Sequence, residues 1–424
     1  MMAMLLFVSF IILIFIGVPV AFSLGISSLI YLIVADIPLT IIPQKMFGGL
    51  NSFVLLCIPG FILAGNLMNA GGITDRIINF ANNCVGHIRG GLGLANVGSS
   101  MGFAGISGTA LADTASIGAV LIPAMKKEGY GAGFSAAVTA SSSTVGPIIP
   151  PSLPMIIVGT LASVSIGDLF LAGALPGILL GFGLMIPTYI ISVKRNYPKG
   201  ERKSFREIWK SFTGAFWALF MTIIILFGIL GGYFTPTEAS IIAVLYAFVI
   251  GIFVYKELPL RKIPEIMLSS MTSTASIMLL VGFANLFGWI MVSEQIPGLV
   301  ANAILSISSN PIVVILLINL LLLFVGTFME TIAALVILFP VLLPVAVSVG
   351  MDPVQFGVMM VLNLVIGLVT PPVGVCLFVA SQIGKVSIGK TTRELVPFLG
   401  VSLAILLLVA FVPQVTLFLP SLFE

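Results

Sequence analysis

Two proline pairs interrupt apolar stretches of this 424-residue sequence. Pro150-Pro151 closes the segment 145–151, and Pro371-Pro372 closes the segment 366–372. A proline removes a backbone hydrogen-bond donor, clashes with the preceding helical turn and pushes the residue before it out of helical geometry. Each pair therefore predicts a helix that stops and restarts. Carbonyl oxygens left free at such a break can coordinate a cation, and the N-terminus of the second half-helix can face an anion.

A proline kink without a ligand is the plain alternative for either pair alone. The two segments, however, occupy matching places. Val145 and Ile366 lie 221 residues apart, and each is followed directly by glycine and five residues later by a proline pair. Ligand-binding breaks in both halves are therefore the favoured interpretation.

Two acidic residues lie in apolar stretches elsewhere in the two halves. Asp113 precedes Pro123 by ten residues, and Glu330 precedes Pro340 by the same ten. Ionisable groups inside a membrane are costly unless they are paired or functional. We therefore expect both to bind a ligand or to orient the segments that carry them. The residues expected at the substrate are Asp113, Ser142, Ser143, Glu330 and Thr331.

Composition places these features inside a membrane. Hydrophobic residues make up 59% of the chain and charged residues 8%, and the mean hydropathy is +1.23. Soluble proteins carry roughly 25% charged residues. Apolar runs of transmembrane length recur along the chain, which predicts an all-α polytopic membrane protein. The first run, Met4–Val34, is too long for a signal-peptide core, and we expect a retained span with a cytoplasmic N-terminus.

The cations fall in five clusters, and Lys45 alone lies outside them. The clusters are 76–89, 126–127, 194–210, 256–262 and 385–393. By the positive-inside rule the clusters are cytoplasmic, and the loops near Asp36, Asp168 and Asp352 face outside. The apolar stretches 92–124 and 311–347 then begin and end on the same face. This is typical of helical hairpins that re-enter the membrane and line a cavity.

Loop charges also give the relation between the two halves. The clusters 76–89 and 126–127 align with cation-free loops of the second half, whereas the loop near Asp168 aligns with the cluster 385–393. The halves are therefore expected to be inverted copies, as in many secondary transporters. The acidic residues lie 217 residues apart and the breaks 221, which predicts a four-residue insertion between them.

This repeat predicts five parts of the chain. They are scaffold spans with a first cytoplasmic segment at 1–90, the first hairpin and broken helix at 91–168, further scaffold spans with a central cytoplasmic loop and interfacial helices at 169–310, the second hairpin and broken helix at 311–390, and a C-terminal span at 391–424.

Five segments together carry a resemblance to a known family. They are GVPVA at 17–21, PGFILAG at 59–65, SGTALAD at 107–113, GPIIPPS at 146–152 and TPPVG at 370–374. They run over nearly the whole length. The sequence resembles the large membrane subunit (M subunit) of tripartite ATP-independent periplasmic (TRAP) transporters.

The resemblance implies a protein of the bacterial inner membrane that imports an organic acid, such as a sialic acid or a C4-dicarboxylate, with sodium and without ATP. It implies two partners, a periplasmic binding protein that delivers the substrate and a small four-helix membrane subunit. Because the sequence starts with a span, the small subunit is expected as a separate chain. The resemblance also implies an elevator-type transporter, in which a mobile domain carries both hairpins and both broken helices.

Two sodium sites are implied by the same resemblance. The first comprises Ser107, Thr109, Gly146, Ile149 and Pro151, and the second comprises Gly326, Thr327, Gly367, Thr370 and Val373. Several of these residues would contribute backbone carbonyls.

Other functions would use the same features. A stand-alone sodium–dicarboxylate symporter would need no binding protein. A passive channel would favour repeated polar rings, whereas the polar residues here concentrate at two breaks. An intramembrane enzyme using Asp113 and Glu330 is weaker, because two carboxylates alone specify no reaction. The sequence has no glycine-rich phosphate loop, so ATP hydrolysis is not expected, and its single histidine, His87, excludes a histidine metal cluster. We expect neither an enzyme nor a nucleic-acid partner.

Overall fold

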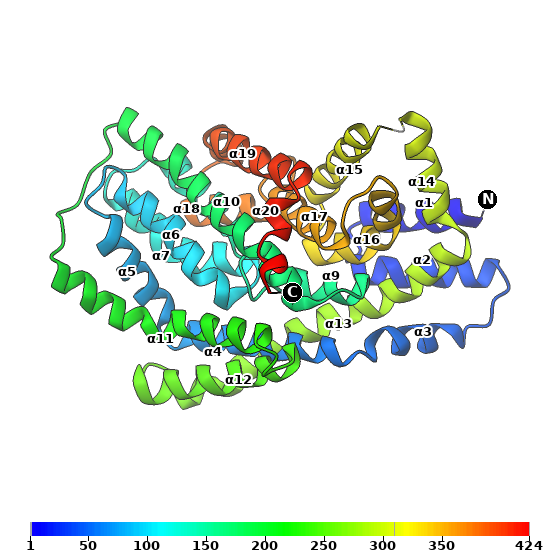
Figure 1. Cartoon of the computed structure of the whole chain (residues 1–424), viewed down its shortest axis with the longest axis horizontal. Helices are drawn as coiled ribbons and strands as arrows, with labels where there is room; N and C mark the ends of the chain where they lie inside the picture. The colour runs from blue at the N-terminus through cyan, green and yellow to red at the C-terminus, as the bar shows by residue number, and fades with distance from the viewer. Residues whose placement is uncertain (1, 309, 424) are drawn as a thin grey trace.

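The computed structural model describes residues 2–308 and 310–423, and the regular elements in these ranges are helices (Figure 1). Seven helical segments of the described chain are long and apolar enough to cross a membrane. They are Phe53–Ala70, Ile166–Lys194, Phe205–Leu230, Pro236–Val254, Leu260–Ser293, Thr331–Ser348 and Ile388–Phe411. The predicted all-α polytopic class is confirmed.

The first apolar run forms two helices instead of the single span that we expected. α1 (Met2–Phe15) and α2 (Val20–Val34) are separated by a turn in which Gly17 has a φ of +91° and Pro19 precedes the first residue of α2. Glycine tolerates positive φ and proline cannot continue a helix, so this pair ends α1. Figure 1 places the N-terminus and the end of α2 at the same end of the molecule. A single span therefore does not carry the chain outward from a cytoplasmic N-terminus.

One group of helices forms the lower layer of the molecule in Figure 1. They are α3 (Ile41–Leu50), α4 (Cys57–Ala70), α11 (Phe205–Leu230), α12 (Pro236–Val249) and α13 (Ile263–Ser293). α4 packs on α12 and α13, and α13 packs on α2 and α3. Within 169–310 the sequence predicts interfacial helices at 201–210 and 258–267; in the structure, residues 205–210 and 263–267 are the first turns of α11 and α13.

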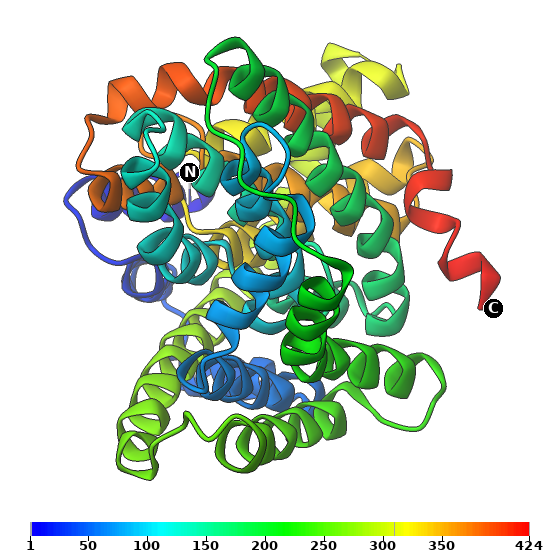
Figure 2. The same cartoon turned by 90° about the vertical axis from the view of Figure 1, so that its left-hand side faces the viewer.

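Two series of helices carry the hairpins and the breaks. The first comprises α5 (Ile73–Val85), α6 (Gly91–Ser107), α7 (Ala110–Lys127), α8 (Ala132–Ser142), α9 (Leu153–Ala162) and α10 (Ile166–Lys194). The second comprises α14 (Ile296–Ile307), α15 (Pro311–Gly326), α16 (Thr331–Ser348), α17 (Pro353–Gly367), α18 (Val375–Gly384) and α19 (Ile388–Phe411), followed by α20 (Gln414–Leu417). Figures 1 and 2 show the α6–α7 hairpin and the α15–α16 hairpin on opposite sides of the broken helices.

Helix boundaries give the register of the two halves. α7 begins at Ala110 and α16 at Thr331, and the two helices end at Lys127 and Ser348, so both pairs of ends lie 221 residues apart. The starts of α8 and α17 have the same separation, as do the two proline pairs. One offset therefore relates the second arm of each hairpin to its break, and the predicted four-residue insertion between them is wrong.

The common offset changes which residues are equivalent. Thr109 and Glu330, the N-cap residues of α7 and α16, are counterparts, and Asp113 corresponds to Ala334. The sequence prediction paired Pro123 of α7 with Pro340 of α16, and therefore Asp113 with Glu330. The true counterpart of Pro123 is the second proline of α16, Pro344.

The five basic clusters meet on one face of the protein. Contacts join each cluster to another or to a residue directly beside it: Arg76 to Glu257 at 2.8 Å, Arg89 to Asn196 at 2.8 Å, Arg195 to Glu394 at 2.8 Å, and Lys126 to the carbonyl of Gly384 at 2.8 Å. The predicted grouping of these loops on a single side is thereby confirmed.

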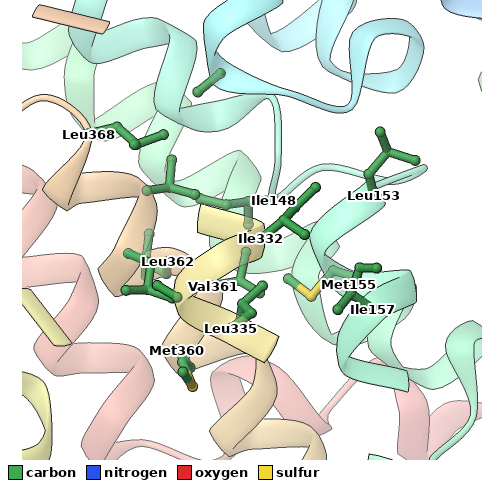
Figure 3. Close-up of a cluster of buried hydrophobic side chains, with 14 of the residues drawn as sticks. Ile148, Leu153, Met155, Ile157, Ile332, Leu335, Met360, Val361, Leu362 and Leu368 are labelled. Atoms are coloured by element: carbon green, nitrogen blue, oxygen red, sulfur yellow. The ribbon is translucent and has the colours of Figure 1, made fainter. Parts of the chain in front are cut away.

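A shared apolar core holds the two halves together. Figure 3 shows Ile148 and Met155, beside the first break, packed near Ile332 of α16 and Val361 of α17. All four side chains are at most 5% exposed. The first broken helix therefore packs on the hairpin of the opposite repeat, which brings the two breaks into one body.

Candidate functional site

The tip of the first hairpin lies against the first break. α6 ends at Ser107, whose side chain lies outside the described residues; Gly108 follows with a φ of +60°, and Thr109 caps α7. Glycine is favoured here by its backbone conformation. It is also favoured by space, because a Cβ on Gly108 would lie 3.3 Å from the carbonyl oxygen of Pro151. The tip thus meets the backbone of the break directly.

The first break is irregular backbone between α8 and α9. A short 3-10 helix, Ser143–Val145, continues α8, and Ser152 caps α9 by accepting a hydrogen bond from the Met155 amide at 3.2 Å. Among the described residues, the carbonyl oxygens of Ile149 and Pro151 accept no backbone hydrogen bond. Two carbonyls expected at the first sodium site are therefore available to a cation.

Backbone contacts also join the second hairpin to the second break. α15 ends at Gly326 and α17 at Gly367, and a Cβ on Gly367 would collide with the backbone of Gly326. Beyond the break, the Gly374 amide donates to the Thr327 carbonyl at 3.1 Å. The structure therefore brings together three residues expected at the second sodium site, Gly326, Thr327 and Gly367.

Two hydroxyls at the second hairpin and break keep their capacity to accept. Thr370 Oγ1 donates to the Ile366 carbonyl at 2.8 Å, and Thr327 Oγ1 donates to the Phe324 carbonyl at 2.8 Å. A hydroxyl that gives its one proton to its own helix still presents two lone pairs. Val373 is 47% exposed and offers a cation only its backbone carbonyl.

The two breaks differ in exposure. Gly146 and its neighbours through residue 152 are buried, except for partly exposed Ile149. α10 covers them closely, since a Cβ on Gly173 would lie 2.7 Å from the Ile148 carbonyl oxygen. At the second break, Pro372 is exposed. The second break is therefore the more accessible of the two in this structure.

The two acidic residues lie in different surroundings. Glu330 is exposed and caps α16, accepting hydrogen bonds from the amides of Ile332 at 2.9 Å and Ala333 at 3.2 Å. Such a cap satisfies a carboxylate. Asp113 is 0% exposed in the first turn of α7, and neither of its carboxylate oxygens has a hydrogen-bond partner in the described part of the chain. The expected equivalence of these two residues does not hold.

The other residues expected at the substrate are enclosed. Ser142 and Ser143 are 0% exposed; their hydroxyls donate to Asn96 Oδ1 at 3.2 Å and to the Thr139 carbonyl at 2.8 Å. Thr331 is 3% exposed, and its hydroxyl has no partner within the ranges described. A substrate could reach them only after the surrounding helices separate.

The family described as the DctM component of the tripartite ATP-independent periplasmic transporter matches residues 7–415. The chain belongs to this family. One similar protein is the sialic acid TRAP transporter large permease protein SiaM of Vibrio cholerae, 46% identical over 412 residues, with 97% of this chain and 96% of that protein covered. Another is the C4-dicarboxylate TRAP transporter large permease protein DctM of Rhodobacter capsulatus, 39% identical over 437 residues, with 100% and 99% covered.

Solved structures show the same fold at low identity. The YdaH transporter of Alcanivorax borkumensis superposes with a TM-score of 0.60 over 87% of this chain and 86% of that one, at 15% identity. The likeness concerns the fold alone. The resemblance inferred from the sequence is thus confirmed at the level of the TRAP family and of a multi-pass helical transporter.

Buried asparagine side chains of this TRAP family member were not predicted from the sequence as site residues. Asn96 on α6 donates to Thr139 Oγ1 at 2.7 Å, and Asn363 on α17 donates to Asn319 Oδ1 on α15 at 2.7 Å. Each bond connects the first arm of a hairpin, α6 or α15, to the first half of a broken helix, α8 or α17. The available signal was an amide inside an apolar helix, where hydrogen bonding across helices is the usual solution.

Proposed function

We propose that this TRAP family member is the large membrane subunit of a sodium-coupled importer of an organic acid. The similarity to permeases named for sialic acid and for C4-dicarboxylates supports a substrate of one of these classes. A periplasmic binding protein delivers the substrate and a small membrane subunit accompanies the chain, as the family's name as a tripartite periplasmic transporter suggests. The basic face lies in the cytoplasm.

The observation that carries this proposal is the contact of each hairpin tip with a broken helix. Four helices begin beside these contacts: α7 at Ala110, α9 at Leu153, α16 at Thr331 and α18 at Val375. A helix N-terminus carries a partial positive charge, which attracts an anion even where a side chain such as Ser152 already caps some of its amides. Free carbonyls at the breaks attract a cation. The centre therefore suits an organic anion bound together with cations.

Sodium ions occupy two sites in this proposal, one at each tip and break. The first uses Thr109, Gly146, Ile149 and Pro151 together with Ser107, and the second uses Gly326, Thr327, Gly367, Thr370 and Val373. Support comes from the free carbonyls of the first break and the accepting hydroxyls of the second. Bound cations lower the cost of bringing an anionic substrate to membrane depth, which is the physical basis of the coupling.

An elevator motion moves the hairpins and breaks as one body, residues 91–168 and 311–390, past the remaining helices. Side-chain contacts across the α4–α7 and α11–α6 boundaries suit such movement. Asn69 on α4 donates to Ser116 on α7 at 3.1 Å, and Thr222 on α11 lies 3.4 Å from the Gly105 carbonyl oxygen on α6. Single polar contacts of this kind are weak enough to break and reform.

Uptake by reconstituted vesicles tests the proposal. The chain is reconstituted with its candidate small subunit, and organic-acid accumulation is measured with an inward sodium gradient, with and without the candidate binding protein. Accumulation that requires both the gradient and the binding protein is the expected result. Uptake that needs no binding protein would identify a stand-alone symporter, and flux that only equilibrates the acid would identify a channel.

A further inference from the structure

Asp113 presents an electrostatic problem that the two sites above do not solve. Its carboxylate is 0% exposed, and both oxygens lack a hydrogen-bond partner among the described residues. Burying a carboxylate costs several kcal/mol, and the cost stays uncompensated unless a cation, a proton or hydrogen-bond donors face the group. The surroundings of Asp113 must therefore supply one of these.

The hydroxyls beside the carboxylate donate elsewhere. Ser100 and Ser143 lie next to Asp113. The Ser100 hydroxyl is bonded to Ser142 at 3.0 Å, and the Ser143 hydroxyl donates to the carbonyl of Thr139 at 2.8 Å. Each of these two serine oxygens still has lone pairs, which can bind a cation together with the carboxylate of Asp113.

The hydrogen-bond chain continues away from the carboxylate. Ser142 donates to Asn96 Oδ1 at 3.2 Å, the Asn96 amide donates to Thr139 Oγ1 at 2.7 Å, and Thr139 donates to the Ser135 carbonyl at 2.9 Å. On the other side, Thr114 gives its proton to the Ala110 carbonyl at 2.9 Å. These bonds direct the protons of Asn96, Thr114, Thr139 and Ser142 to groups other than the carboxylate of Asp113.

The second repeat shows that the fold does not require polar groups here. At the common offset of 221 residues, Asp113 corresponds to Ala334 and Ser143 to Leu364, and both counterparts are buried. The same packing is thus achieved with apolar side chains. A carboxylate retained in one repeat at such a cost needs a ligand to explain it.

We propose that Asp113, Ser100 and Ser143 form a sodium site of their own, separate from the two sites related by symmetry. Carboxylate and hydroxyl oxygens suit a hard cation. A monovalent ion balances the single negative charge, whereas a divalent ion would leave a buried net charge. The site lies between α6, α7 and the first break, so a bound ion draws the hairpin onto the break. This inference rests on the proposed sodium coupling, and it assigns Asp113 and Ser143 to a cation instead of to the substrate.

Counting bound sodium tests the site. Radioactive sodium is measured by equilibrium dialysis on the purified full-length chain, for the wild type, for Asp113→Asn and for Asp75→Asn, an exposed carboxylate on α5. The expected result is one fewer sodium ion bound by Asp113→Asn and an unchanged number for Asp75→Asn. An unchanged number for Asp113→Asn overturns the site. Absence of sodium binding by the wild type overturns the proposed sodium coupling as well.

Thermal unfolding separates a cation site from a structural role. Asp113→Asn removes an uncompensated charge, so it is expected to unfold at a higher temperature than the wild type without sodium and at a lower temperature in saturating sodium. A lower unfolding temperature in both conditions contradicts the proposal. If Asp113→Asn fails to fold, the double variant Ser100→Ala/Ser143→Ala keeps the carboxylate and decides. It is expected to raise the half-saturating sodium concentration roughly tenfold, and unchanged sodium binding overturns the site.

Discussion

Thr370 is the residue at which the second sodium site is most directly tested. Its hydroxyl donates to the Ile366 carbonyl, so its oxygen faces the break as an acceptor. We expect Thr370→Ala to raise the sodium concentration that gives half-maximal uptake by about tenfold, the effect of losing roughly 1.4 kcal/mol of binding. Thr370→Ser keeps the oxygen and is expected to behave as the wild type. Sodium titration of uptake in vesicles gives the measurement.

A matched control exists on α19. Thr392 donates to the carbonyl of Ile388 at 2.9 Å, the same i to i−4 bond in a helix that carries no site residue. Thr392→Ala is expected to leave sodium dependence unchanged. Equal sodium dependence of Thr370→Ala and the wild type would remove Thr370 from the site.

At this scale, residue types were easier to predict than residue partners. Asp113 and Glu330 stand out in the sequence because carboxylates are rare in apolar segments. Their difference depends on a helical turn of register that the sequence leaves ambiguous, since α16 contains both Pro340 and Pro344. The two carboxylates differ because Asp113 is buried and Glu330 caps a helix. The order of residue types in the sequence predicts neither the burial nor the cap.

The contact between α15 and α17 depends on the absence of side chains. A Cβ on Gly367 would collide with Gly326, while the φ of Gly367 lies outside the region reserved for glycine. Gly367→Ala is therefore expected to keep α17 helical but to push the second hairpin off its break. We expect the stabilisation of the protein by sodium, measured as a shift in unfolding temperature, to fall by at least half, because part of it comes from the linked site.

Gly389→Ala on α19 is the control for this substitution. A Cβ there meets no atom within 4 Å, and alanine favours a helix more than glycine does. This variant is expected to unfold at the same temperature as the wild type or a higher one, with full stabilisation by sodium. A Gly367→Ala variant that responds to sodium as strongly as Gly389→Ala would show that close contact at this point is dispensable.

Elements were predicted where proline or charge marks them. Both breaks and both hairpins follow from the proline pairs and from loop basicity, which act locally. The division of the first run into α1 and α2 was missed because Gly17 and Pro19 sit in a continuous apolar stretch. The starts of α11 and α13 were also missed. Charged residues there were expected to end the membrane-spanning helix, whereas the helix continues through them.

The basic face of the whole molecule contains ion pairs that join distant segments. Arg76 on α5 bonds Glu257, between α12 and α13, through two contacts of 2.8 and 3.0 Å, and stacks 3.9 Å from the Tyr255 ring centre. The bond with Arg76 holds the pKa of Glu257 below its ordinary value. The pair therefore stabilises the fold above the ordinary carboxylate pKa, about 4.3, and this stabilisation is lost as the pH falls through the lowered value.

Glu257→Gln is expected to unfold slightly more easily than the wild type at pH 7, by less than about 1 kcal/mol because the carboxylate is half exposed and screened. The difference is expected to shrink as the pH falls below about 4.3 and to disappear below the lowered pKa of Glu257. Chemical unfolding at the two pH values measures it, with Glu201→Gln, an exposed residue, as the control. A difference that persists undiminished in acid would mean that Glu257 acts through packing instead of charge.

Movement of one group of helices past another is the largest-scale prediction. Asn69 on α4 and Ser116 on α7 touch across the boundary at which sliding is proposed. In a Cys84→Ala background, which leaves two buried cysteines, the variant Asn69→Cys/Ser116→Cys is expected to lose uptake on oxidation and to regain it on reduction.

Asn66→Cys/Ser270→Cys is the matched control, because these side chains lie 2.8 Å apart on α4 and α13, both outside the moving body. Oxidation is expected to leave its uptake intact. The disulfide of the oxidised Asn69→Cys/Ser116→Cys variant is verified by electrophoresis after the chain is cleaved between the two cysteines. If this crosslinked variant transports as well as the wild type, α7 does not slide along α4.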